Sequence, residues 1–455
     1  MQNIQAGRGV SIERPFSQPG AAPAVMSSAS TFPNSDGEFS DKVARGLSRF
    51  IQWLDKYGET SWDHQSFFAG PVGGKAKALY YRHRTIGTAA VAPIILCEAF
   101  LPSARRLFHH RIRFPIADAH YAMGFLFLYQ ATGKSSYLGR AFDFLNELTK
   151  SRCPGFEEYC WGYPFDWVTR GGLIRKDTPL ITTTPYIYEA FLQAFAIDQR
   201  DEWKKVLASI ARHARFDIKD FETSPTASSC SYSPFDGGGV INAAAYRAFL
   251  LCSASHLLAN DDYRQTAARN LNFVLETQNQ DGSWYYAVDG VRDFVDHFHT
   301  GFVMKALGKI YAMTRDERCY DALARGVQYY LKNLFDEEGL PKPFSKAPRL
   351  TVYKRELYDC AECINLGLVL RDSFPYLEKA IETVINEILK NWVKPDGSFR
   401  SRRLRLGWDK VPMHRWGQSQ MFRSLAYYLS ETKKTEKLKA ETLKGEPVGL
   451  TTLQA

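Results

Sequence analysis

Two kinds of helical segment alternate along the chain. Segments of the first kind begin with small or polar residues and then stay apolar nearly all round, as buried helices do. They cover residues 117–130, 182–195, 241–254, 296–310, 358–370 and 413–429, at spacings of roughly 55 to 65 residues. Segments of the second kind have one charged face and cover residues 40–58, 135–150, 201–214, 261–278, 316–335 and 374–392. Six buried helices alternating with six half-exposed ones predict an all-α fold, the (α/α)6 toroid or six-hairpin barrel.

Two related turns give this repeat an internal register. The sequence DGSW begins at Asp281 and DGSF begins at Asp396, and a histidine follows each by 18 positions, as His299 and His414. An Asp-Gly step supplies the positive φ that ends an outer helix. The spacing therefore predicts that His299 and His414 occupy equivalent positions at the start of inner helices, facing a shared cavity or making a shared structural hydrogen bond.

The toroid is expected over residues 39–430. Residues 1–38 are rich in Pro, Ser, Gly and Ala and are predicted to be a flexible lead-in, whereas residues 431–455 read as a polar tail. The first unit is longer than the others, because the segment 59–116 carries one extra predicted helix over 87–101.

The loops that precede the inner helices differ from those at the opposite ends. They are long and combine aromatic with ionisable residues, in the segments 160–172, 230–239, 282–299, 344–359 and 406–418. The opposite connections, such as ATGKSS and AIDQRD, are short. All inner helices of such a ring run the same way, so the long loops meet at one mouth, where we expect the functional site.

The residue types in these loops suit a sugar chain. Pyranose C–H faces stack on aromatic rings, while carboxylates, amides and Arg contact the hydroxyl groups. Six inner-helix N-termini direct partial positive charge into the cavity, which favours an anionic substrate. A terpenoid-processing toroid would carry an acidic DxDD or DDxxD cluster, and the sequence has neither.

Candidate residues follow from position near the mouth. The candidates for catalysis are His299, Asp296, Asp166, Tyr186 and His414. The candidates for substrate binding are Trp161, Tyr163, Arg170, His120, Asp236, Trp284, Asp289, Arg415 and Trp416. Structural roles are open for several of them, because Asp296 also suits a helix N-cap and Asp166 with Arg170 suits a loop ion pair.

Cysteine usage indicates a reducing compartment. Eight scattered cysteines do not form a disulfide framework, and only Cys360 and Cys363 are close in sequence. These two with His414 could form a zinc site, although buried free thiols are the commoner explanation, and we expect no metal or cofactor.

The N-terminus lacks the apolar region of a signal peptide. The longest apolar run, 89–100, contains Pro93 and Glu98 and is shorter than the roughly 20 residues of a membrane span. A cytoplasmic protein without a transmembrane segment is predicted.

The net charge of +9 is concentrated in residues 105–113 and 400–410. Such surfaces attract nucleic acid, anionic lipid or anionic glycan, or are simply solvated. Because no RNA- or DNA-binding signature is present, a nucleic acid partner is not expected.

Several motifs resemble known families. The QDGSW-type turns between alternating helices resemble the squalene-cyclase and prenyltransferase repeat and six-hairpin carbohydrate-active enzymes. The runs RFPIADAHYAMGF, CWGYPFDW, TPLITTTPYIYEAF and QDGSWYYAVDG followed by DHFHTGF resemble bacterial VpsJ-like proteins found with exopolysaccharide and capsule genes, over about residues 60–430. The prenyltransferase zinc pattern is Asp-x-Cys, and here Asp359 and Cys360 are adjacent.

The VpsJ-like resemblance implies a cytoplasmic role in polysaccharide production, with no catalytic residues to transfer. We therefore expect an enzyme that acts on a glycan or glycan-lipid, through lyase, epimerase or hydrolase chemistry, with other polysaccharide biosynthesis enzymes as candidate partners. Two alternatives are a metal-dependent prenyl- or terpenoid-processing toroid and a non-catalytic glycan-binding component of a synthase complex.

Overall fold

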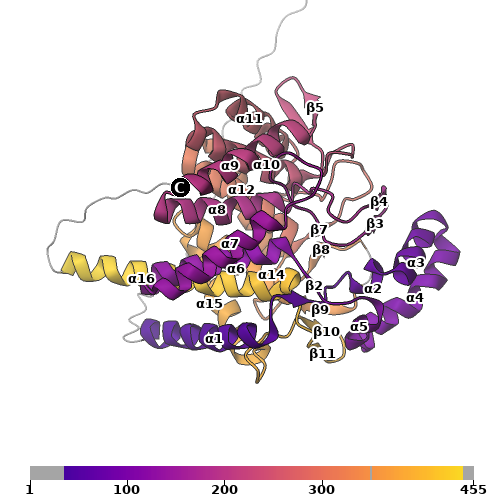
Figure 1. Ribbon diagram of the computed structural model, residues 1–455, viewed down its shortest axis with the longest axis horizontal. Coiled ribbons are helices and arrows are strands. Elements are labelled where there is room, and N and C mark those ends of the chain that lie inside the picture. The colour runs from indigo at the N-terminus through magenta and orange to yellow at the C-terminus, as the bar shows by residue number, and fades with distance from the viewer. Residues whose placement is uncertain (1–34, 349–350, 444–455) are drawn as a thin grey trace, which may run out of the picture.

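Twelve helices form a closed double ring in the computed structural model, which describes residues 35–348 and 351–443 (Figure 1). The inner helices are α6 (Pro115–Thr132), α8 (Thr184–Asp198), α10 (Ile241–Leu258), α12 (His297–Thr314), α14 (Leu357–Leu370) and α16 (Ser419–Leu443). The outer helices are α1 (Ser35–Tyr57), α7 (Ser135–Lys150), α9 (Asp201–Arg212), α11 (Asp261–Glu276), α13 (Glu317–Asn333) and α15 (Glu378–Glu387). The predicted (α/α)6 toroid is confirmed.

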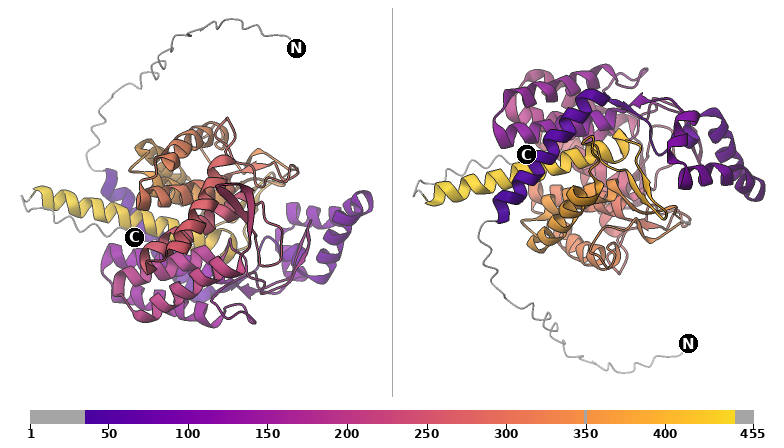
Figure 2. Two further views of the ribbon diagram at one scale, coloured as in Figure 1. Left: turned by 90° about the horizontal axis from the view of Figure 1, so that it is seen from above. Right: turned by 90° about the horizontal axis from the view of Figure 1, so that it is seen from below.

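The ring closes between the two ends of the chain. Helix α16 packs against both α6 and α14, and the outer helix α1 packs against α16, so the first helix completes the last hairpin (Figure 2). The inner helices are buried nearly all round, and in α10 every residue from Ile241 to Ser255 is buried. The outer helices bury one face only, as their charged faces predicted.

Short strands pair in the loops that precede the inner helices. The pairs are β1 (Thr60–Ser61) with β2 (Ile112–Arg113), β3 (Trp167–Thr169) with β4 (Gly172–Ile174), β5 (Asp220–Ser224) with β6 (Ala227–Cys230), and β7 (Val295–Asp296) with β8 (Phe344–Lys346). A three-stranded sheet joins β9 (Tyr353–Glu356), β10 (Arg402–Leu404) and β11 (Trp408–Asp409) in the order β11-β10-β9. These pairings shape the loop side of the ring into a fixed mouth.

A helical hairpin projects from the loop side of the ring (Figures 1 and 2). It follows α2 (Ser66–Ala69) and consists of α3 (Pro71–Arg82), α4 (Arg84–Phe100), η1 (Pro102–Ala104) and α5 (Arg105–Phe108). The predicted extra helix corresponds to α4, which begins earlier than expected. Helix α3 was not predicted, because its two adjacent glycines, Gly73 and Gly74, lower helix propensity.

The C-terminal boundary also differs from the prediction. Helix α16 continues to Leu443, through part of the segment predicted to be a polar tail, and ion pairs such as Lys433 with Glu436 line its exposed part. Helix α1 begins at Ser35, and the predicted lead-in before it lies outside the described residues. Shorter turns complete the fold: η2 (His213–Asp217), η3 (Pro375–Leu377), η4 (Ile388–Trp392) and η5 (His414–Gln418).

The two Asp-Gly turns are structurally equivalent, as their spacing predicted. Gly282 has a φ of +90° and Gly397 a φ of +93°. A Cβ on Gly282 would lie 2.5 Å from the carbonyl oxygen of Arg325 in α13, and one on Gly397 would lie 2.4 Å from that of Arg49 in α1. Helices α13 and α1 therefore take the same place in their units.

The histidines that follow these turns pair differently from the expectation. His297 bonds to the carbonyl oxygen of Leu334, just after α13, and His414 bonds to that of Gly58, just after α1. Each also bonds to a tyrosine hydroxyl, Tyr330 for His297 and Tyr121 for His414. The repeat partner of His414 is thus His297 and not His299, because the loops between turn and helix differ in path.

Candidate active site at the mouth of the ring

The start of α12 holds an acid–histidine pair at the mouth. Asp296 is the N-cap of α12, and its Oδ1 accepts a hydrogen bond from the backbone N–H of His299 at 2.8 Å. Its Oδ2 lies 2.6 Å from Nδ1 of the same histidine. The Asp296 side chain is 2% exposed and that of His299 is 22% exposed. The expected cap and the expected catalytic pair are therefore one arrangement.

This geometry fixes the chemistry of His299. A carboxylate at Nδ1 orients the ring and stabilises a proton on Nδ1, so Nε2 of the neutral ring keeps its lone pair. The pairing of β7 with β8 sets Asp296 opposite Phe344, so the cap is anchored in a strand. An imidazole held in one tautomer beside a carboxylate is suited to accept and return a proton.

Aromatic side chains surround this pair. The His299 ring lies 4.6 Å from that of Tyr286, 4.3 Å from Phe298 and 5.6 Å from Phe302. Phe298 also contacts Trp416, whose indole stacks on Tyr358 with ring centres 4.4 Å apart. A small pocket at His299 is lined by Asn242, Trp284, Tyr285, Tyr286, Thr300 and Val303.

The aromatic lining continues around the mouth. Tyr163 contacts Trp167, which contacts Tyr232, with ring centres 5.5 and 6.3 Å apart. The guanidinium of Arg415 lies 4.5 Å from the Tyr163 ring and 5.3 Å from that of Trp416. It therefore links the rings around Trp167 to the rings around His299. We call these half-buried rings, Tyr163, Trp167, Tyr232, Tyr286, Phe298 and Trp416, the aromatic rim.

Two tyrosines of the aromatic rim keep their protons over a wide pH range. Burial raises the pKa of Tyr232, and the neighbouring Tyr163 and Tyr286 raise it further. Burial likewise raises the pKa of Tyr286, against the opposing effect of Arg292. Neutral phenols act as hydrogen-bond donors and acceptors, which suits contact with hydroxyl or carboxylate groups.

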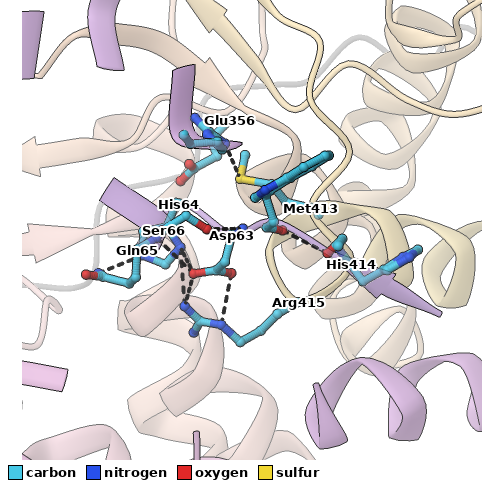
Figure 3. A network of polar contacts seen from close by, with 12 residues as sticks. Asp63, His64, Gln65, Ser66, Glu356, Met413, His414 and Arg415 are labelled. Carbon is cyan, nitrogen blue, oxygen red and sulfur yellow. Dashed lines mark hydrogen bonds and ion pairs between the residues drawn. The ribbon is translucent and has the colours of Figure 1, made fainter. Parts of the chain in front are cut away.

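Arg415 is held by a buried ion pair with the first loop of the chain (Figure 3). Its Nη2 and Nε donate to the two oxygens of Asp63 at 2.6 and 3.0 Å. Burial alone would raise the pKa of Asp63, but the positive charge of Arg415 lowers it well below its usual value. Burial lowers the pKa of His64 to about 3, so this ring, 4.0 Å from Trp416, is neutral.

His120 and Tyr186 lie in a buried polar network between the inner helices, and their side chains are almost wholly inaccessible. The Tyr186 hydroxyl bonds to the hydroxyl of Tyr246 at 2.6 Å, and the Lys305 amine lies 3.5 Å from the Tyr186 hydroxyl. Lys305 pairs with Glu362, and Lys309 pairs with Glu189, which also lies 3.8 Å from Arg423. The structure places these two candidates among buried charges and not in the aromatic rim.

Three other candidates have packing positions. Trp161 and Trp284 are buried and donate from Nε1 to the carbonyl oxygens of Leu148 and Val274, each at 2.9 Å and each in the preceding outer helix. His414 is buried, and burial lowers its pKa to about 3. The polar atoms of these three side chains are bonded to the backbone or to a neighbour and do not face a substrate, although the ring of Trp284 lines the small pocket at His299.

The remaining candidates lie in turns or outside the mouth. Asp236 accepts hydrogen bonds from Tyr232, Ser233 and Gly238 of its own loop, and Asp289 accepts bonds from Val291 and Arg292. The backbone and side-chain bonds of Arg292 overcome the effect of burial and lower the pKa of Asp289 to about 2.

Asp166 and Arg170 line a groove of about 670 Å³ between the β3–β4 hairpin and α3. Asp166 pairs with Arg175, not with Arg170. Trp167, the next residue, joins the aromatic rim, because successive strand residues point to opposite faces.

The two cysteines of α14 are buried beside a buried acid. Burial raises the pKa of both Cys360 and Cys363. Burial, and then Glu356 and Asp296, raise the pKa of Asp359 well above its usual value. Within residues 35–348 and 351–443, no group of three or more His, Cys, Asp or Glu side chains is arranged to hold a metal ion.

Several residues of the mouth were not among the candidates predicted from the sequence. The aromatic residues Tyr286, Phe298, Trp167 and Tyr232 all lie in the predicted mouth loops, so aromatic content alone would have identified them. Asp63 and His64 gave no such signal, because they precede the projecting hairpin in a segment not counted among the mouth loops.

The toroid is shared with solved enzyme structures, although no family model and no curated protein sequence matches the chain. It is similar to cellobiose 2-epimerase from Bacillus thermoamylovorans, with a TM-score of 0.55 and 11% identity, covering 71% of this chain and 88% of the epimerase. It is also similar to unsaturated glucuronyl hydrolase from Bacillus sp. GL1, with a TM-score of 0.55 and 12% identity, covering 85% and 96%. A D-mannose isomerase has a TM-score of 0.52 and 14% identity, covering 71% and 88%. At sequence identities this low, the structural similarity shows a shared fold and nothing about the reaction.

Proposed function

We propose that the protein is a carbohydrate-active enzyme that moves a proton at a carbon atom of a sugar residue. The observation that carries the proposal is the pairing of His299 with Asp296, 2.6 Å apart, at a partly exposed position within the aromatic rim. The rim provides stacking surfaces for pyranose faces. The enzymes of like fold include an epimerase and a sugar isomerase, which supports the substrate class.

His299 acts as the base in this proposal. Its Nε2 takes the proton from the carbon next to a carboxylate or carbonyl group, and the Asp296 carboxylate stabilises the imidazolium that forms. Neutral hydroxyls of Tyr232 and Tyr286 donate to the oxyanion that develops on the substrate. Delivery of a proton from water to the opposite face gives epimerisation, and His299 then returns its own proton to solvent. Elimination breaks the C–O bond at the next carbon, and the His299 imidazolium gives its proton to the leaving oxygen.

Hydrolysis by two carboxylates has less support. It requires two acids facing one substrate, about 5 to 10 Å apart. Asp166 lines the groove beside α3, Asp236 is bonded into its own loop, and Asp296 is occupied by His299. Each of the three candidate carboxylates thus has another role.

The proposal extends to the setting of the reaction. The net charge of +9 and the six inner-helix N-termini favour an anionic glycan or glycan-lipid. The VpsJ-like motifs support a place among exopolysaccharide or capsule biosynthesis enzymes. All eight cysteines are free thiols, which supports a cytoplasmic location.

The reaction is tested with purified protein and a panel of acidic and neutral oligosaccharides in D₂O. Deuterium at a ring carbon, with or without inversion, indicates proton transfer, and absorbance of an unsaturated uronate indicates elimination. Either result supports the proposal. New reducing ends without deuterium would instead indicate hydrolysis. Binding without any reaction across the panel would indicate a glycan-binding protein, and both outcomes would reject His299 as a base.

A further inference from the structure

The projecting hairpin, residues 71–108, exposes an apolar face to water. Ile86 is 62% exposed, Leu96 57% and Phe100 60%. Leu101 at 63% and Leu107 at 83% are also exposed, beyond the end of α4. Contiguous exposed apolar surface of this kind marks a site of interaction.

The exposed apolar residues of α4 form one stripe. Ile86, Ala89, Pro93, Leu96 and Phe100 follow one another at intervals of three and four residues, which places them on one side of a helix. The opposite side of α4 carries Gly87 and Ile94, which are buried, with Gly87 packed on Tyr80 of α3. A helix on a water-facing surface has the reverse pattern, with its apolar stripe inward.

Basic residues accompany the stripe. Residues 71–108 contain Lys75, Lys77, Arg82, Arg84, Arg105 and Arg106, and Glu98 is the one acidic residue among them. Lys75, Arg82, Arg84 and Arg106 are exposed, and none forms an ion pair with a carboxylate in the part of the chain that the structure describes. The hairpin therefore carries a net positive charge as well as its apolar stripe.

Two ion pairs fix the hairpin to the ring and leave the stripe free. Glu98 accepts from Nη1 of Arg402 in β10 at 2.7 Å. Arg105 donates to Asp409 in β11 at 2.6 Å and is fully buried. The acidic residue and one basic residue are thus used for attachment, on the side of the hairpin that faces the sheet β11-β10-β9.

No helix of the hairpin has by itself the length and apolar character of a membrane span. Among the described helices, none alone is long and apolar enough to cross a bilayer. Helix α4 reaches the length and apolar character of a span only together with residues 102–108, and the two segments are bent by 116° relative to each other. An apolar stripe of this size with basic neighbours is the pattern of helices that lie in the membrane interface.

We propose that the projecting hairpin docks on the surface of an anionic lipid bilayer. Ile86, Leu96 and Phe100 enter the boundary between headgroups and acyl chains, while Lys75, Arg82, Arg84 and Arg106 contact lipid phosphates. The hairpin stands on the loop side of the ring, as Figure 1 shows, so docking brings the mouth close to the bilayer. A glycan attached to a lipid could then reach the mouth while its anchor stays in the membrane.

Vesicle flotation with the full-length protein tests this proposal. Vesicles of phosphatidylcholine with an equal part of phosphatidylglycerol are compared with vesicles of phosphatidylcholine alone, at low and high salt. We expect binding to the anionic vesicles that weakens as salt is added. The double variant Leu96→Glu/Phe100→Glu is expected to bind at least about tenfold more weakly, since both side chains lose their burial in lipid.

A matched control separates this effect from general loss of surface apolarity. Phe216 is 66% exposed on η2, far from the hairpin in sequence, and Phe216→Glu is expected to bind like the wild type. Unchanged melting temperatures show that the variants are folded. Equal binding of the double variant and wild type, or no binding to either vesicle, would overturn the proposal. So would a wild-type dimer in solution that the double variant converts to a monomer, because a second copy would then cover the stripe.

Discussion

At the scale of single residues, Asp296 combines two roles that its sequence position left as alternatives. One oxygen caps α12 and the other holds the His299 ring. A cap and a catalytic partner make different demands, because an amide caps a helix about as well as a carboxylate does. Only the carboxylate stabilises an imidazolium. The two roles can therefore be separated by one isosteric substitution.

Asp296→Asn is expected to lower the rate of proton transfer by about tenfold to several thousandfold. It should change the melting temperature little, since the amide oxygen still accepts from the His299 N–H. Rates and thermal unfolding of the same preparation provide the check. Asp316→Asn, at the N-cap of the outer helix α13, is the control and should leave the rate unchanged. An Asp296→Asn enzyme with full activity would remove the carboxylate from the mechanism.

Asp63 gives a prediction about pH. Its pKa is lowered in the folded protein, so the unfolded chain binds more protons at acid pH. Its stabilising effect is therefore fully present above about pH 4, the pKa of an unperturbed aspartate, and decreases as the pH falls below that value.

Asp63→Asn leaves Arg415 buried without a counter-charge, at a cost of about 3–5 kcal/mol at neutral pH. Denaturant unfolding at several pH values measures this difference between variant and wild type. The difference should be constant from pH 8 to pH 5 and shrink below about pH 4. A difference that grows on acidification would contradict the charge pairing.

At the scale of elements, the Asp-Gly turns show how the ring is built from repeated units. Gly282 and Gly397 combine a positive φ with close approach to a carbonyl of the next outer helix. The buried histidines His297 and His414 then tie the start of each inner helix to the end of that same outer helix. Turn and histidine together fix the position of the hairpin that follows.

Gly282→Ala and Gly397→Ala are expected to destabilise the protein by similar amounts, about 2 kcal/mol or more, since both add strain at positive φ and a backbone clash. Gly290→Ala is the matched control. It has a φ of +69° with nothing within 4 Å of the added Cβ, so about 1 kcal/mol is expected. The free energies of unfolding of the three variants test this prediction. A large difference between Gly282→Ala and Gly397→Ala would contradict the equivalence of the two turns.

At the scale of the whole molecule, the sequence predicted the ring well, because helix periodicity and burial are local properties that alternate regularly. The site was predicted less completely. The pair at His299 was found because both residues lie in one helix start. Arg415 and Trp416 were found, but their partners Asp63 and His64 were not, since contacts over some 350 positions leave no local pattern.

The errors have a common physical origin. Trp161, Trp284 and His414 have the polar and aromatic character of binding residues, yet the structure uses that character inside the ring, to satisfy carbonyl groups at helix ends. Residue type does not distinguish a buried hydrogen-bond partner from an exposed one. The repeat spacing added to the difficulty, because it aligned His414 with His299 where the structure aligns it with His297.

The central claim is that His299 transfers a proton at a sugar carbon. Deuterium uptake from D₂O into a reactive oligosaccharide, compared between wild type, His299→Gln and His256→Gln, tests it most directly. His256 is exposed near the C-terminal end of α10, the end of the inner helix away from the mouth, and serves as the control. The account predicts that His299→Gln stays folded and loses at least about a hundredfold in exchange rate, while His256→Gln exchanges like wild type. Full exchange by His299→Gln would contradict it.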